Sequence, residues 1–69
     1  MEFNKKLDLH GVRHHEVDRL VENFVLLNEP PLIILCGNSD KMPKLIEDVL
    51  HRHDIKDWWR VNNGEYKIL

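Results

Sequence analysis

Apolar residues recur along this chain with the period of a helix in two segments. In residues 13–28 they follow the i, i+3, i+4, i+7 spacing of one helical face, and the same spacing returns in residues 42–53. Pro30 and Pro31 end the first segment, and Pro43 falls in the first turn of the second, where its missing N–H costs nothing. The apolar positions are Val17, Leu20, Val21, Phe24 and Val25, then Met42, Leu45, Ile46, Val49 and Leu50. The pattern predicts two amphipathic helices.

Shorter runs with strand signals lie before, between and after these helices. Residues 6–10 alternate polar and apolar side chains and stop at a glycine. Residues 32–36 are a continuous apolar run between prolines and a glycine, which favours a strand buried on both faces. Residues 57–61 and 65–69 also read as strands, and the Asn63-Gly64 pair between them is a strong hairpin signal.

The predicted order is β-α-β-α-β-β in a single domain spanning residues 1–69. Right-handed crossovers between parallel strands place both helices on the same face of the sheet. The prediction is therefore an α/β fold: a two-layer sandwich with a mixed sheet, two helices on one face and an antiparallel strand at one edge. The other face has no helix to cover it. It is either a homodimer surface or a shallow face that stays partly solvated.

Composition and charge narrow the function classes. With 42% hydrophobic and 32% charged residues, the chain has an ordinary globular composition. It has no apolar run long enough for a membrane span and no signal-peptide pattern, so no membrane partner is expected. One cysteine excludes an internal disulfide and favours a cytoplasmic location. The net charge of −2 is unusual for a nucleic-acid binder, which normally has a basic surface.

The candidate chemistry lies where the first predicted strand ends. Ligands favour the edge of an α/β sheet at which the carboxyl ends of parallel strands meet. Asp8 and His10 are two residues apart at this edge and are expected to point to the same side. A carboxylate that orients a histidine is typical of a general acid or base, although the same pattern also serves as a turn or cap.

The second predicted strand leads to a candidate phosphate site. Gly37, Asn38 and Ser39 precede a helix whose N-terminal N–H groups and dipole favour an anion, and Lys41 and Lys44 lie within reach. A loop of this composition is also ordinary capping chemistry. Flanking cations at the start of the first helix are Arg13 and His14. These residues predict a locally positive pocket in a chain of balanced charge.

Together these segments resemble a known family. Residues 7–11, Leu-Asp-Leu-His-Gly, reproduce the Leu-Asp-x-His-Gly motif that opens the Smr (small MutS-related) domain, and Glu16-Val17 matches the pair that follows it. Residues 32–39 with Met42 look like the second motif of the family, with Cys36 where Thr or His is common. Residues 63–69 are similar to its terminal strand. The resemblance covers essentially the whole chain.

The resemblance implies a fold like the C-terminal domain of bacterial translation initiation factor three, and binding or cleavage of RNA or DNA. It implies that Asp8 and His10 carry out cleavage and that the loop at Gly37, Asn38 and Ser39 binds nucleic acid. RNA is favoured because a histidine can activate a 2′-hydroxyl without a metal, whereas DNA hydrolysis usually recruits an ion such as Mg²⁺. The alternatives are a non-catalytic RNA-, DNA- or ribosome-binding module and a homodimeric interaction protein.

Other reactive residues have plainer interpretations. The five histidines lack carboxylate or cysteine partners at a zinc spacing, so no metal site is expected. Cys36 precedes a helix but lacks the arginine that a phosphate-binding loop needs, which favours a buried strand residue. Trp58 and Trp59 are adjacent on a strand, so one is expected in the core and the other on the uncovered face. There it either anchors a dimer or stacks on a base.

Overall fold

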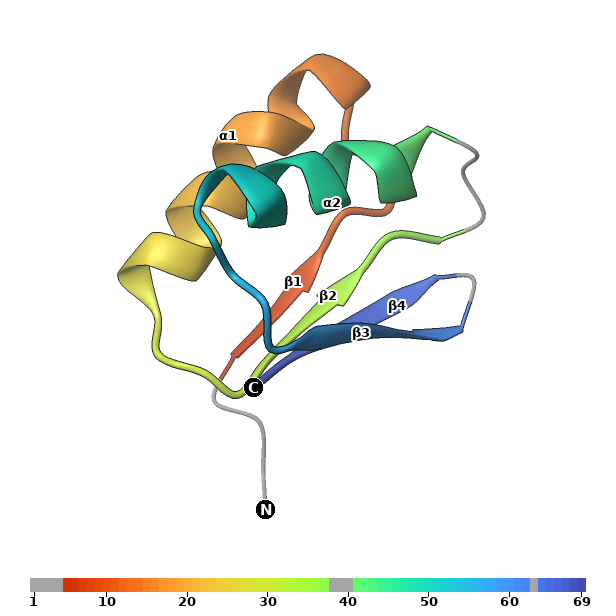
Figure 1. The fold of residues 1–69 in the computed structure, drawn as a ribbon. Helices are drawn as coiled ribbons and strands as arrows, with labels where there is room; N and C mark the ends of the chain where they lie inside the picture. The colour runs from red at the N-terminus through yellow and green to blue at the C-terminus, as the bar shows by residue number, and fades with distance from the viewer. Residues whose placement is uncertain (1–4, 38–40, 63) are drawn as a thin grey trace.

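The computed structural model describes residues 5–37, 41–62 and 64–69 and shows the predicted order of elements, each boundary within two residues of its predicted place. The six elements are β1 (Lys5–Asp8), α1 (His14–Leu27), β2 (Leu32–Leu35), α2 (Met42–Arg52), β3 (Trp58–Asn62) and β4 (Glu65–Ile68). Both helices lie on one side of a four-stranded mixed sheet (Figure 1). The predicted two-layer α/β arrangement is confirmed.

The order of the strands differs from the prediction. The sheet runs β1-β2-β4-β3, with β1 and β2 parallel and β4 antiparallel to both of its neighbours. The antiparallel strand is therefore internal, and the prediction that it forms an edge is wrong. The reason is side-chain burial: β4 offers Tyr66 and Ile68 to the core, whereas most of β3 is exposed. On the side that Tyr66 shares, β3 carries the charged Arg60, which stays exposed at the edge of the sheet.

Burial alternates along β2, which corrects a second expectation. Leu32 and Ile34 are fully buried against the helices, whereas Ile33 and Leu35 are only half-buried on the opposite face. The prediction that this strand is buried on both faces is therefore wrong. It has one core face because no helix in the described part of the chain covers the other side.

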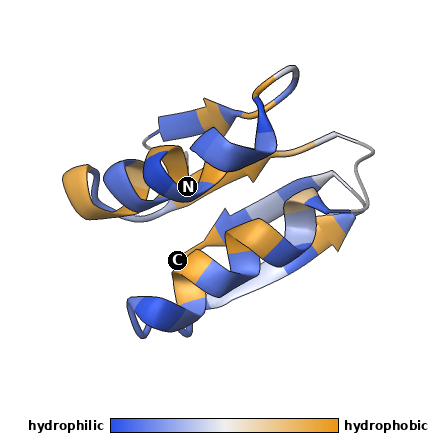
Figure 2. Cartoon of the chain, turned by 90° about the horizontal axis from the view of Figure 1, so that it is seen from above, coloured by the Kyte–Doolittle hydropathy of each residue, from blue (hydrophilic) through white to orange (hydrophobic). Residues whose placement is uncertain are grey.

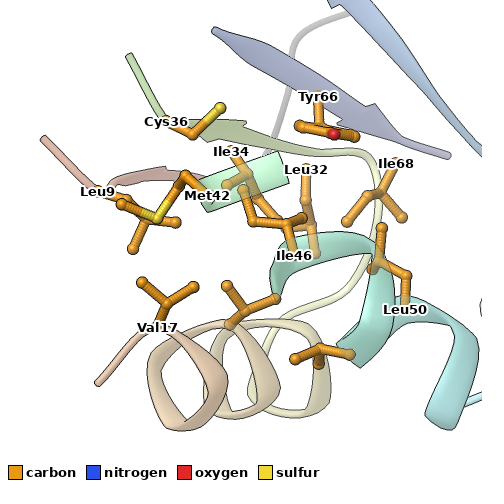
Figure 3. Packing of buried hydrophobic residues seen from close by; sticks show 12 residues of the cluster. Leu9, Val17, Leu32, Ile34, Cys36, Met42, Ile46, Leu50, Tyr66 and Ile68 are labelled. Atoms are coloured by element: carbon orange, nitrogen blue, oxygen red, sulfur yellow. The ribbon is translucent and has the colours of Figure 1, made fainter. Parts of the chain in front are cut away.

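The core fills the space between the sheet and the helices (Figure 3). Its members come from both helices, β2, β4 and the segments after the first two strands: Leu9, Val17, Val21, Leu32, Ile34, Cys36, Met42, Ile46, Val49, Leu50, Tyr66 and Ile68. Each large side chain buried here contributes roughly 1.5–3 kcal/mol of hydrophobic stabilisation. Seen from above, both helices alternate between hydrophobic and hydrophilic residues, as the spacing predicted (Figure 2).

Two local predictions meet different outcomes. Trp58 packs against the core, with its ring 5.7 Å from that of Tyr66, while Trp59 is 45% exposed, so the prediction that they face opposite ways is confirmed. The residues expected to cap the second helix, Asn38 and Ser39, lie outside the described residues. The N-cap of this helix is Lys41, whose side chain makes no capping hydrogen bond.

Within the described residues, no helix has the length and apolar character needed to cross a membrane.

Candidate active site

Asp8 and His10 form a hydrogen-bonded pair at the end of β1. Oδ1 of Asp8 accepts a hydrogen bond from the backbone N–H of His10 at 2.9 Å and lies 2.5 Å from Nδ1 of the same residue. Because an ionised carboxylate only accepts hydrogen bonds, Nδ1 carries the hydrogen of this contact. In the neutral ring, Nε2 is then the basic nitrogen. Both side chains are about 60% exposed, which leaves the pair accessible to a substrate.

The charge of Asp8 is supported by its surroundings. The hydrogen bonds from the backbone and the ring of His10 lower the pKa of the Asp8 carboxyl below its usual value of 3.8, and the positive charge of Lys6 lowers it further. The carboxylate is therefore ionised at neutral pH. It can hold the ring in one tautomer and stabilise the imidazolium that forms when Nε2 takes up a proton.

Gly37 lies directly against the imidazole of His10. Its φ is +65°, and a Cβ built on it would stand 2.8 Å from both Cδ2 and Nε2 of that ring. Only glycine accommodates both the left-handed backbone and the close ring. Leu9 extends the pairing of the first two strands by donating a backbone hydrogen bond to Leu35 at 2.7 Å. The end of β1 and the residues after β2 are thereby joined, and the two sequence motifs meet at His10 and Gly37.

Gly64 packs behind Gly37, a contact that the sequence did not predict. A Cβ on Gly64 would stand 3.2 Å from the backbone oxygen and 3.3 Å from the backbone nitrogen of Gly37. The carbonyl of Gly64 also accepts a hydrogen bond from the backbone N–H of Cys36 at 2.8 Å. The Asn-Gly signal identified the hairpin but not this packing. Sequence spacing contains no information on which loop stands behind which, because the contact depends on the position of β4 beside β2.

A second group of predicted residues lines a pocket between the starts of the two helices. His14 of α1 and Lys41, Lys44 and Leu45 at the start of α2 surround a hollow of about 560 Å³. The first turn of α2 contains no acidic residue, so the positive end of its dipole is not neutralised there. Three of the four basic residues that were expected to converge, His14, Lys41 and Lys44, line this pocket together. Because β1 and β2 are parallel, both strands end at the same edge of the sheet, where Asp8 and His10 also lie.

The remaining predicted site residues are placed less fully. Arg13 is the exposed N-cap of α1, makes no side-chain cap hydrogen bond and is not among the residues that line the pocket. Asn38 and Ser39 lie outside the described residues. The structure therefore assembles two groups, the Asp8–His10–Gly37 cluster and the pocket of His14, Lys41 and Lys44, at one edge of the sheet.

Cys36 adds no nucleophile to the candidate active site, and the metal-binding residue types form no cluster among the described residues. Cys36 is 3% exposed, so its predicted burial is confirmed, although β2 ends one residue earlier, at Leu35. Burial raises the pKa of its thiol, which disfavours the nucleophilic thiolate form. Among the residues that the structure describes, no group of three or more His, Cys, Asp and Glu side chains is arranged to hold a metal ion.

Comparison with protein-family models, with curated proteins and with solved structures found no match to this chain.

Proposed function

We propose that this chain is a small Smr-like domain that binds nucleic acid and cleaves RNA with the Asp8–His10 pair. The observation that carries the proposal is the 2.5 Å contact between Nδ1 of His10 and Oδ1 of Asp8, which leaves Nε2 as the basic nitrogen of an exposed ring. A carboxylate that fixes the tautomer of a histidine is a standard arrangement for general base catalysis.

The proposed reaction begins at the 2′-hydroxyl of a ribose. Nε2 of His10 removes its proton, the oxygen forms a bond to the adjacent phosphorus, and the bond from phosphorus to the 5′ oxygen breaks. The products are a 2′,3′-cyclic phosphate and a 5′-hydroxyl, whose oxygen receives a proton. Asp8 stabilises the imidazolium that forms on the way. General base catalysis of this kind contributes typically about 10²–10⁴-fold to a rate.

The pocket at the helix starts supports the binding half of the proposal. Lys41, Lys44 and His14 surround a hollow at the N-terminus of α2, where phosphate groups are favoured by the dipole and by the lysine charges. Few phosphates fit a site of this size, so the affinity should be modest and should fall with added salt. The negative net charge of the chain does not oppose this, because Lys41, Lys44 and His14 are brought together in one pocket.

Cleavage of labelled oligonucleotides tests the proposal. Purified protein is incubated with single- and double-stranded RNA and DNA, with and without EDTA, beside His10→Ala, Asp8→Ala and the matched control His15→Ala. His15 is an exposed histidine of α1 outside both groups. We expect RNA to be cut by the wild type and by His15→Ala, at a rate reduced about 10²-fold or more in His10→Ala. An RNA with a single 2′-deoxyribose at the cut site should resist cleavage there.

The alternatives give different results in the same experiment. Equal cutting by wild type and His10→Ala would show a contaminating nuclease and refute the catalytic role. Salt-sensitive binding without cleavage, weakened by Lys41→Ala and Lys44→Ala, would identify a non-catalytic binding module. Cleavage of DNA that stops with EDTA would replace the 2′-hydroxyl mechanism by one that needs a divalent ion, with Asp8 as a ligand.

A further inference from the structure

The sheet face away from the helices carries two rows of side chains with opposite charge. Residues that stand opposite each other in the strand registers share a face, and alternate residues along each strand lie on that same face. The first row, here the basic row, contains Lys6, Ile33, Lys67 and Trp59, in the order β1, β2, β4, β3. The second row, here the acidic row, contains Asp8, Leu35 and Glu65; on β3 a register shift between Arg60 and Asn62 interrupts the alternation, and Asn62 stands opposite Glu65.

This face is also apolar at its centre and at one side. Ile33 and Leu35 of β2 are half-buried between the charged residues of the neighbouring strands, and Trp59 is 45% exposed at the edge strand. Within the described residues, Figure 1 shows no helix on this side of the sheet. Large exposed aromatic side chains beside an apolar centre are typical of surfaces that bind another macromolecule.

We infer that this face is the contact surface of a symmetric homodimer, with two copies of the sheet packed face to face. A two-fold axis that runs along the rows, midway between them, places the basic row of one copy over the acidic row of the other. Lys67 then faces the partner's Glu65, Lys6 faces the partner's Asp8, and Ile33 packs against the partner's Leu35. Every contact of the face occurs twice, as an isologous interface requires.

The charge pattern of the face favours a second copy of the chain over a nucleic acid as its binding partner. Among the described residues of the two rows, two lysines are balanced by two carboxylates, so the rows together have no net charge. A phosphate backbone laid on it would meet Asp8 and Glu65 and would release few counterions. A second copy instead meets a charge pattern complementary to its own, which suppresses wrong partners and sets the register of the contact.

The area of the face limits the affinity of the dimer. Four strands about 4.8 Å apart and about four residues long, at ~3.3 Å per residue, give a footprint of about 19 Å by 13 Å. The flat footprint is therefore about 250 Å² per copy and about 500 Å² in total, well below the about 1,200 Å² that stable interfaces bury. The dissociation constant is therefore expected to be on the order of tens of micromolar or weaker. The inference does not depend on the proposed nuclease activity, but it places the partner's Lys6 against Asp8, so the form with an accessible Asp8–His10 pair is the monomer.

Charge reversal on β4 tests this geometry. Lys67→Glu leaves two acidic residues on β4, and Glu65→Lys leaves two basic ones, so each single variant should repel its own copies across the interface. Each is expected to raise the dissociation constant at least tenfold in sedimentation equilibrium. An equimolar mixture of the two should form heterodimers. The double variant should recover the wild-type association, because exchanging both charges again places opposite signs across the interface. Lys44→Glu, a matched reversal on α2, should dimerise like the wild type.

The outcomes separate the geometry from its rivals. Circular dichroism first establishes that each variant is folded. A wild type that stays monomeric at millimolar concentration overturns the inference. Single variants that dimerise as well as the wild type overturn the proposed register, and so does a mixture that shows no heterodimer. Loss of dimerisation in Lys44→Glu would place the interface on the helical layer instead.

Discussion

Gly37→Ala tests the contact between the two halves of the candidate active site. Gly37 has a φ of +65°, and Gly11 has a φ of +76°, so a side chain at either position occupies the left-handed region. For a residue with a Cβ that conformation costs roughly 1–2 kcal/mol. The two positions differ in their surroundings. A Cβ on Gly37 would stand 2.8 Å from Cδ2 and Nε2 of His10, whereas a Cβ on Gly11 would have nothing within 4 Å.

The two alanine variants should therefore lose similar stability but differ at the imidazole. The ring of His10 is exposed, so it can rotate away from the new Cβ at little cost in stability. The steric contact should therefore change the position of the ring more than the free energy of unfolding. We expect both variants to unfold about 1–2 kcal/mol more easily, which corresponds to a Tm about 4–16 °C lower in a domain of this size. Only Gly37→Ala should weaken the bond from His10 to Asp8 and slow RNA cleavage.

Three measurements check this difference. Thermal unfolding compares the stability of the two variants, NMR of the ring carbons and nitrogens follows the tautomer and titration of His10, and the cleavage assay follows activity. Unchanged His10 resonances in Gly37→Ala would refute the inferred contact. A much larger stability loss in Gly37→Ala than in Gly11→Ala would show that the ring is held rigidly instead of yielding to the new Cβ.

Two further predictions concern hydrogen bonds to carboxylates. The folded-state pKa of Asp8 lies below its usual value of 3.8, so its charge stabilises the fold above that pH and this contribution is lost as the pH falls through the lower folded value. In urea unfolding followed from neutral pH to below pH ~3, Asp8→Asn should lose less stability on acidification than the wild type; equal pH dependence would contradict the linkage. The buried Tyr66 donates its hydroxyl hydrogen to Glu47, so Tyr66→Phe should lower the free energy of unfolding by about 1–3 kcal/mol. Glu47→Gln keeps an acceptor and should cost less, and a wild-type stability in Tyr66→Phe would show that the hydrogen bond contributes nothing.

Much of the fold follows from local patterns that the sequence contains. Apolar residues at helical spacing identified the inner faces of both helices, and the flanking prolines and glycines limited each element to within two residues of its observed end. Asp8 and His10 were expected on the same side from the alternation of a strand; β1 ends at Asp8, and the pair is held instead by a turn in which the N–H of His10 donates to Oδ1 of Asp8. These predictions succeed because the interactions are between near neighbours in the chain.

The errors arose where the outcome depends on competition between distant segments. Either strand of the terminal hairpin could have joined β2, and the buried Tyr66 and Ile68 decided in favour of β4. The half-burial of Ile33 and Leu35 likewise depends on what covers the far face of the sheet, which a continuous apolar run does not reveal. Hydrophobic content predicts that a segment is a strand but not which neighbours it obtains.

The sequence by itself therefore determined the elements, the inward faces of the helices and the local Asp8–His10 pair, because each depends on spacing within a few residues. Only the tertiary structure decided that Gly37 lies against His10 with Gly64 behind it, that the lysines of α2 share a pocket with His14, and that charges on separate strands align in two opposite rows. Those contacts join segments distant in the chain, and the order of strands in the sheet sets them.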